Sequence, residues 1–211
     1  MTEDFARYTK SHWHGLDEEG RKLVAAEHLE RAKKGSAAWN NWNDRFDSWT
    51  NQNKNFNAYI YFDGINFGNL WNFAGYQFCV TTSFKGASFG SEKGGFLDFS
   101  DASFREGADF EGAEFSGGSA KFEGARFDYQ GLKARGAHFG LGANFSHATF
   151  RCARLHFDEA EFDGGVSFQN AKFLGLEADF IGTIFRKDAN SLRAASNAER
   201  DSPGLCLRVP G

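Results

Sequence analysis

The sequence predicts an all-β solenoid preceded by an α-helical cap, and three observations support this fold class. The 211 residues include 25 Phe and 25 Gly but a single Met, which indicates one local environment repeated many times. A six-residue unit, Phe-x-Gly-Ala-x-Phe in its clearest copies, recurs along more than half of the chain. Inward-facing residues alternate with outward-facing ones inside each unit, as extended chain requires.

Residues 1–55 are predicted to form the cap. Asp17 is placed to N-cap a helix that runs to about Lys34, and its apolar side consists of Leu23, Val24, His28, Leu29 and Ala32. Ser36 is expected to cap a second helix, whose aromatic face consists of Trp39, Trp42, Phe46 and Trp49. Because a solenoid must cover its terminal coils, we expect this face to plug the first coil. The alternative is a partner-binding site at Trp39, Trp42 and Trp49.

Residues 56–185 are predicted to form the solenoid. Eleven units begin at residues 62, 73, 84, 99, 110, 122, 134, 145, 157, 168 and 180. The steps are 11 or 12 residues except the one from 84 to 99, where residues 90–95 indicate an inserted loop. Phe fills 21 of the 22 expected positions, and the exception, Ala134, leaves the later units in phase. A small or apolar residue, most often Ala, lies two positions before each Phe, so both positions are expected to point inward.

Each unit supplies two extended faces, and four faces are needed to enclose a core. One coil should therefore take two units, about 23 residues, and eleven units should give five to six coils. The Phe side chains then form columns. The predicted core includes one column of Phe62, Phe84, Phe110, Phe157 and Phe180, together with Phe115, Phe139 and Phe162 on another face.

This repeat resembles the pentapeptide-repeat family, which places Leu or Phe at the centre of each five-residue face and Ala two residues earlier. The resemblance implies a right-handed quadrilateral β-helix. Ideal coils of that family take 20 residues, so the extra residues here are expected as bulges at two of the four corners. The stretch from Trp39 to Asn43, Trp-Asn-Asn-Trp-Asn, is similar to a lead-in found before many bacterial repeats of this kind. The competing left-handed hexapeptide solenoid of acyltransferases requires a strict six-residue step, which the repeated step of five breaks.

Residues 186–211 form a polar tail. A short helix is expected at Asp188 to Glu199 and disorder from Ser202 onward. Such a tail covers the last coil weakly, which leaves three options open: a longer natural chain, a homodimer formed through a terminal coil, or an atypical end.

The sequence contains no recognisable catalytic, cofactor-binding or metal-binding motif. His12 and His14 lie on a segment expected to be extended, without the further ligands that a metal needs. No phosphate-binding loop or nucleophile elbow occurs, and no enzyme is predicted. No signal peptide is predicted, and no apolar run is long enough to span a membrane. Cys79, Cys152 and Cys206 are expected to be reduced, which favours a cytoplasmic protein, with Cys79 and Cys152 as outward or corner thiols.

The leading functional prediction is a non-catalytic scaffold that binds an unknown protein partner and binds neither nucleic acid nor membrane. The second hypothesis is DNA mimicry, because some proteins of the family occupy the DNA site of gyrase and Asp109, Glu111 and Glu114 cluster in one unit. Against it, the residue after the first Phe of alternate units changes sign down the stack, which predicts stabilising ion pairs. These residues are Asp63, Lys85, Glu111, Arg135 and Asp158. Another face is net basic, with Arg105, Arg126, Arg151 and Lys172 beside Asp128. The third hypothesis is an acyltransferase on a hexapeptide solenoid.

Overall fold

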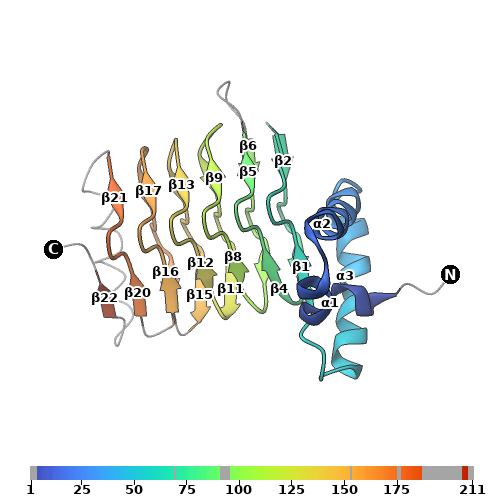
Figure 1. Ribbon diagram of the computed structural model, residues 1–211. Coiled ribbons are helices and arrows are strands. Elements are labelled where there is room, and N and C mark those ends of the chain that lie inside the picture. Colours follow the sequence, from blue (N-terminus) through green and yellow to red (C-terminus); the bar gives the residue numbers. More distant parts are fainter. Residues whose placement is uncertain are drawn as a thin grey trace.

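The computed structural model describes residues 4–68, 70–90, 96–152, 154–174, 177–186 and 206–208. These residues form a rod of stacked β-coils with a group of helices against its N-terminal end (Figure 1). The predicted solenoid with a helical cap is therefore confirmed. The inserted loop predicted at 90–95 lies, apart from Gly90, outside the described residues.

The cap comprises one 3₁₀ turn and three helices: η1 (Phe5–Tyr8), α1 (Lys10–Gly15), α2 (Glu18–Ala32) and α3 (Ser36–Gln52). Asp17 caps α2 as predicted, since its carboxylate accepts a hydrogen bond from the Gly20 amide at 2.8 Å. Three details of the prediction are wrong. Gly35 and not Ser36 is the N-cap of α3, Leu23 on α2 is 60% exposed, and the segment that carries His12 and His14 is the helix α1 and not extended chain.

The aromatic side of α3 plugs the first coil. Trp39, Trp42 and Phe46 are fully buried, and the Trp39 ring lies 5.4 Å from Phe78 and 5.9 Å from Phe62 between centroids. Because burying such rings removes large apolar areas from water, this contact stabilises the junction between cap and rod.

Polar side chains of α3 also complete the hydrogen bonds of an edge strand. Asn40 Oδ1 accepts from the Gln77 amide at 2.8 Å, and Asn43 Oδ1 accepts from the Cys79 amide at 2.9 Å. The Trp39 indole donates to the Gln77 carbonyl at 2.7 Å. The Trp-Asn-Asn-Trp-Asn stretch thus gives the first coil the partners that a preceding coil would otherwise supply.

The strands form four parallel sheets, one on each side of the rod, which we call the first to fourth faces in chain order. The first face comprises β1 (Tyr59–Tyr61), β4 (Thr81–Ser83), β8 (Ala108–Asp109), β12 (Leu132–Lys133), β16 (Arg154–His156), β20 (Glu177–Asp179) and β22 (Cys206–Arg208). The second face comprises β5 (Ser88–Phe89), β9 (Glu114–Phe115), β13 (His138–Phe139), β17 (Glu161–Phe162) and β21 (Ile184–Phe185).

The third face comprises β2 (Leu70–Asn72), β6 (Phe96–Asp98), β10 (Ala120–Lys121), β14 (Ala143–Asn144) and β18 (Val166–Ser167). The fourth face comprises β3 (Gln77–Phe78), β7 (Ser103–Phe104), β11 (Arg126–Tyr129), β15 (Thr149–Cys152) and β19 (Lys172–Phe173). Five coils are complete in this arrangement, the first two faces continue into a sixth layer, and β22 adds a seventh strand to the first face.

The core consists of the predicted Phe columns. In the first-face column, Phe84 and Phe110 stack at 4.7 Å with an interplanar angle of 1°, and Phe157 and Phe180 stack at 5.1 Å. Ala134 occupies the place between Phe110 and Phe157 and is fully buried. The second-face column stacks Phe115 on Phe139 and Phe139 on Phe162, each at 4.6 Å.

Every unit turns its corner through one residue in the left-handed backbone region. This residue lies two positions after the first Phe: it is Gly in seven units, and Asp101, His147, Glu159 and Asn170 in the others, all with φ between 56° and 71°. The turn closes with a hydrogen bond such as that from the Ala87 amide to the Phe84 carbonyl at 3.0 Å. Because Gly adopts positive φ without a steric penalty, the corner explains the Gly of the repeat.

The extra residues of each coil lie at the other two corners, as predicted. Consecutive Phe positions are five residues apart across the corners that carry the left-handed turn, and six or more apart across the corners between the second and third and the fourth and first faces. The C-terminal strand β22 pairs in parallel with β20, so the disorder predicted from Ser202 is wrong for residues 206–208. The helix predicted at 188–199 lies outside the described residues. Among the described helices, none is both long and apolar enough to cross a membrane.

Candidate functional site

The first face is hollowed beside the cap. The hollow, which we call the niche, has a volume of about 370 Å³. It is lined by Lys10, Trp13, His14, Tyr59, Tyr61, Asp63, Thr81, Ser83, Lys85, Asp109, Gln130 and Lys133. The parallel register aligns Tyr61 with Ser83 and Ser83 with Asp109, and it aligns Tyr59 with Thr81. The positions next to the two tyrosines on β4 therefore carry the small residues Thr81 and Ser83, and this difference in size leaves the niche open.

Aromatic residues form the N-terminal wall of the niche. The short helix α1 places Trp13 on Tyr61, with ring centroids 3.8 Å apart and an interplanar angle of 3°. Lys10 Nζ lies 5.8 Å from the centre of the Tyr59 ring. Tyr61 is 3% exposed, and its hydroxyl has no hydrogen-bond partner among the described residues. A buried hydroxyl without a partner is costly, so this atom calls for a polar group from elsewhere.

Asp63, Lys85 and Asp109 line one wall of the niche, and Glu111 lies just outside it. Lys85 Nζ is 2.7 Å from Glu111 and 3.3 Å from Asp109, and the Lys85 amide donates to Asp63 at 3.2 Å. Burial, together with the neighbouring Asp109 carboxylate, raises the pKa of Asp63, and the hydrogen bonds it accepts oppose that rise. The Lys85 ammonium group thus pairs with Asp109 and Glu111, and no cationic side chain lies at contact distance from the Asp63 carboxylate among the described residues.

Two further hollows adjoin the niche on the same face. One, of about 560 Å³, shares Lys133 with the niche and extends along the rod to Ile181. The other, of about 490 Å³, shares Tyr59, Thr81 and Gln130 and reaches the exposed Phe56 and Tyr129. The three hollows therefore share lining residues and together extend from the corner between the fourth and first faces, beside α3, along the first face to Ile181.

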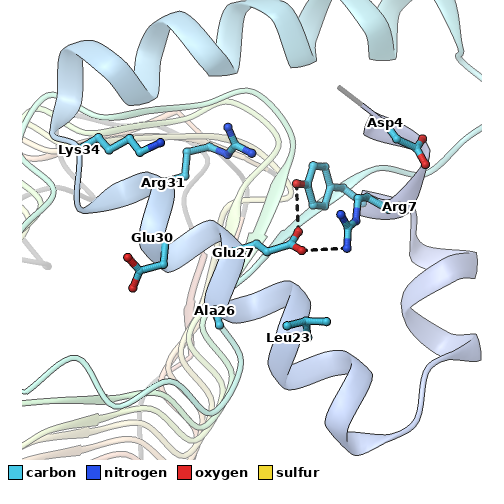
Figure 2. A pocket seen from close by; sticks show the side chains of 9 residues that line it. Asp4, Arg7, Leu23, Ala26, Glu27, Glu30, Arg31 and Lys34 are labelled. Carbon is cyan, nitrogen blue, oxygen red and sulfur yellow. Dashed lines mark hydrogen bonds and ion pairs between the residues drawn. The ribbon is translucent and has the colours of Figure 1, made fainter. Parts of the chain in front are cut away.

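The cap contains a separate pocket between η1 and α2, of about 530 Å³ (Figure 2). Glu27 lies at its centre, 2.9 Å from Arg7 and 3.4 Å from the Tyr8 hydroxyl. Burial raises the pKa of the Tyr8 hydroxyl. The Arg31 guanidinium lies 4.6 Å from the Trp42 ring. Because Arg7 and Tyr8 of η1 contact Glu27 of α2, the polar groups of this pocket hold the N-terminal segment against α2.

The three acidic candidates do not form one patch. Asp109 and Glu111 belong to the first face, whereas Glu114 lies beyond the turn at Gly112 on the second face. The first two contact Lys85, and Glu114 lies 3.1 Å from His138. The carboxylates of Glu114 and Asp163 raise the pKa of His138, Asp163 having the larger effect.

The tryptophan candidates are unavailable as a surface. Trp39 and Trp42 are buried against the first coil, and Trp49 is partly buried against Phe46 at 6.3 Å. Trp39 and Trp42 therefore form the plug of the first coil that the sequence predicts.

Of the ion pairs expected between neighbouring coils, the described residues show one as predicted and one with another partner. Lys85 pairs with Glu111 as the alternating signs predict, but Arg135 pairs with Glu159 at 3.0 Å and not with Asp158. On the basic fourth face, Asp47 of α3 pairs with Arg105, and Asp128 pairs with Arg126 at 2.7 Å. Two of the four basic residues predicted on this face, Arg105 and Arg126, are therefore paired with carboxylates.

Two details of reactive groups follow from the packing. Cys79 is buried under α3 and is not an outward thiol, and burial raises its pKa to about 12.

Two groups of His and carboxylate side chains bring three ligand atoms within 4.8 Å: His138 with Glu161 and Asp163, and His156 with Asp158 and Asp179. Arg186 pairs with both acids of the first group. In the second group, Arg154 Nε lies 3.7 Å from the Asp179 carboxylate. Arginine side chains therefore form ion pairs with carboxylates of both groups.

Comparison with known proteins agrees with this architecture. Residues 151–190 match the family model described as pentapeptide repeats (9 copies). The same repeat, with the same strand register and Phe stacking, extends back to β1. The family match and the Phe-rich solenoid together support a pentapeptide-repeat protein. No curated protein and no solved structure matches it.

Sequence reasoning missed the niche because it did not expect α1 to fold over the first face. The signal in the sequence was a change of residue size on the outward positions of the first face. Tyr59 and Tyr61 occupy these positions in the first coil, and the small Thr81 and Ser83 occupy them in the second.

Proposed function

We propose that this pentapeptide-repeat protein is a non-catalytic scaffold that binds a partner protein across its first face. The observation that carries the proposal is the row of hollows along this face, which begins beneath α1 and crosses several coils. Concave surfaces are where folded proteins accept the side chains of a partner.

The composition of the face supports a protein partner. Tyr59 and the exposed Tyr129 and Ile181 lie among Lys, Arg, Asp and Glu side chains of both signs. Aromatic residues with mixed charges are typical of protein–protein interfaces. A mimic of DNA requires long stripes of negative charge, and the pairing of Glu111 with Lys85 and of Glu159 with Arg135 interrupts such a stripe here.

The proposal is tested by site-specific photo-crosslinking in a bacterial lysate. A photoreactive amino acid replaces Ser83 or Lys133 on the first face, and Asn144 on the third face or Thr149 on the fourth serves as the matched control. We expect one protein to be crosslinked from both first-face positions and from neither control position. Equal crosslinking from all faces, or crosslinking from the third face alone, would refute the proposal.

The identity of the crosslinked protein separates the two interaction hypotheses. Recovery of gyrase subunits, with inhibition of DNA supercoiling by the purified protein, would establish the DNA-mimic alternative. The reversal Glu111→Lys should then abolish that inhibition, whereas Glu123→Lys on the opposite side of the rod should leave it unchanged.

A further inference from the structure

We propose that the niche binds a basic side chain, lysine or arginine, of the partner protein. The inference rests on the proposed function of the first face and specifies its recognition chemistry. Its occupant is an organic cation that lies against Tyr59 and Tyr61 and directs its N–H groups at the Tyr61 hydroxyl and at Asp63.

The unsatisfied hydroxyl of Tyr61 is the first observation. Its ring is covered by Trp13 at 3.8 Å, so it is held in one position, and its oxygen has no partner among the described residues. A phenolic oxygen can accept a hydrogen bond from an ammonium or guanidinium group. The bond would remove the cost of the buried hydroxyl at the moment of binding.

The negative charge beside this hydroxyl is the second observation. The ammonium group of Lys85 contacts Glu111 at 2.7 Å and Asp109 at 3.3 Å. Asp63 receives only the Lys85 amide and the Ser83 hydroxyl. An additional cation in the niche would therefore meet a carboxylate with no charged partner of its own at contact distance.

The aromatic wall is the third observation. The chain's own Lys10 lies 5.8 Å from the Tyr59 ring, which shows that the mouth of the niche accommodates an ammonium group over an aromatic face. The aliphatic stem of a lysine or arginine can pack on such a ring while its charged end reaches farther in.

A metal ion fits the niche poorly. Metal binding needs several ligand atoms within one coordination sphere, and among the described residues the groups of three or more that converge in this way lie at His138 and His156, outside the niche. An anion next to Tyr61 is disfavoured by the Asp63 carboxylate, although Lys133 and Lys10 also line the niche, where they contact the neutral Gln130 amide and the Tyr59 ring.

The test uses four capped tripeptides as probes, titrated into the ¹⁵N-labelled full chain and followed by NMR. They are acetyl-Gly-Arg-Gly-amide, acetyl-Gly-Lys-Gly-amide, and the same peptide with Gln or Glu in the centre. For a single side chain we expect dissociation constants on the order of 1 mM with Arg or Lys. Saturable shifts should centre on the Trp13 indole and on the amides of Thr81 and Ser83.

Three variants make the test specific. Tyr61→Phe removes only the hydroxyl, so the fold should be at least as stable as before, while affinity for the basic peptides should fall about fivefold or more. Asp63→Asn should weaken binding by a similar factor. Glu123→Gln, a charge removal on the far side of the rod, should leave it unchanged.

Stronger binding of the Glu peptide, equal binding of the Gln peptide, or unchanged affinity in both Tyr61→Phe and Asp63→Asn would overturn the inference. If the first face crosslinks to a partner but the basic peptides do not bind, the scaffold proposal stands and the basic-side-chain inference fails. If neither occurs, both fail.

Discussion

Ala134 interrupts the first-face column of Phe rings, and replacing it with Phe tests the account of the core. Its neighbours in the column, Phe110 and Phe157, stack on rings of their own at 4.7 and 5.1 Å. Strands two coils apart are separated by about 9.6 Å, which is the distance that one additional ring between Phe110 and Phe157 would divide into two ordinary stacking steps.

The expected gain follows from these distances. Burying a Phe side chain contributes about 1.5–3 kcal/mol, and each new stacked pair adds about 0.5–1.5 kcal/mol. Ordering the side chain costs roughly 0.5–1 kcal/mol, and displacing atoms that have relaxed toward Ala134 costs about 1–3 kcal/mol. We therefore expect Ala134→Phe to raise the free energy of unfolding by about 1 kcal/mol.

The matched control is Ala137→Phe in the same coil. Ala137 is as completely buried as Ala134 but lies in the row of small residues two positions before each Phe, where the rings already fill the interior. Overpacking there should destabilise the protein by about 3 kcal/mol. Urea denaturation followed by circular dichroism measures both variants.

Equal destabilisation by the two substitutions would refute the reasoning, because it would mean that another side chain already fills the column at Ala134. Tyr129 is excluded as that side chain, since it is 70% exposed. Leu132, which is buried two residues before Ala134, would be the remaining candidate, and Leu132→Ala combined with Ala134→Phe should then restore stability.

Three further predictions concern the cap and the corners. Burial lowers the pKa of His28 to about 3. The stability that the neutral imidazole contributes is therefore fully present above pH ~6.5 and is lost as the pH falls toward 3, by up to about 1.4 kcal/mol per pH unit. Urea denaturation at pH 5 and 7.5 measures this loss. At the left-handed corners, His147→Gly should stabilise the fold by about 1 kcal/mol and Gly136→Ala should destabilise it by a similar amount, as thermal unfolding will show. Asp47→Asn, which breaks the partly exposed pair with Arg105 that joins α3 to the fourth face, should cost about 0.5–1 kcal/mol in unfolding free energy, an effect that high salt should reduce.

Each of these predictions has a contrary outcome. His28→Phe should flatten the pH dependence between pH 5 and 7.5, and an unchanged slope would mean that other groups cause it. Destabilisation by His147→Gly would show that the imidazole makes a contact that outweighs its strained backbone. A salt-independent loss in Asp47→Asn would indicate that the side chain acts by packing.

The rod itself could be predicted from the sequence because its determinants are local and repeated. The spacing of Phe62, Phe84 and Phe110 fixes the column, and the Gly two residues after each of them fixes the turn. The split of the acidic candidates could also have been predicted, since Gly112 turns the chain between Glu111 and Glu114. The two longer corners of each coil hold the extra residues without disturbing the register.

The site depended on contacts between segments far apart in the chain. Nothing local to Trp13 indicates that it stacks on Tyr61, 48 positions later by residue number, because that contact exists only when α1 folds back over β1. The burial of Cys79 has the same origin: its amide donates to Asn43 of α3. Periodicity places a residue on a face, but it does not say which distant segment covers that face.

The position of the cap at the N-terminus has a consequence for the order in which this chain can be built. Each strand pairs in parallel with the one about 23 residues before it, and the first coil is completed by Trp39, Asn40 and Asn43 of α3. A nascent chain leaving the ribosome therefore never waits for a partner strand that has yet to be synthesised. Ribosome-bound chains arrested after the third coil should already show protease-resistant coils, and their absence would mean that the rod closes only when the whole chain is free.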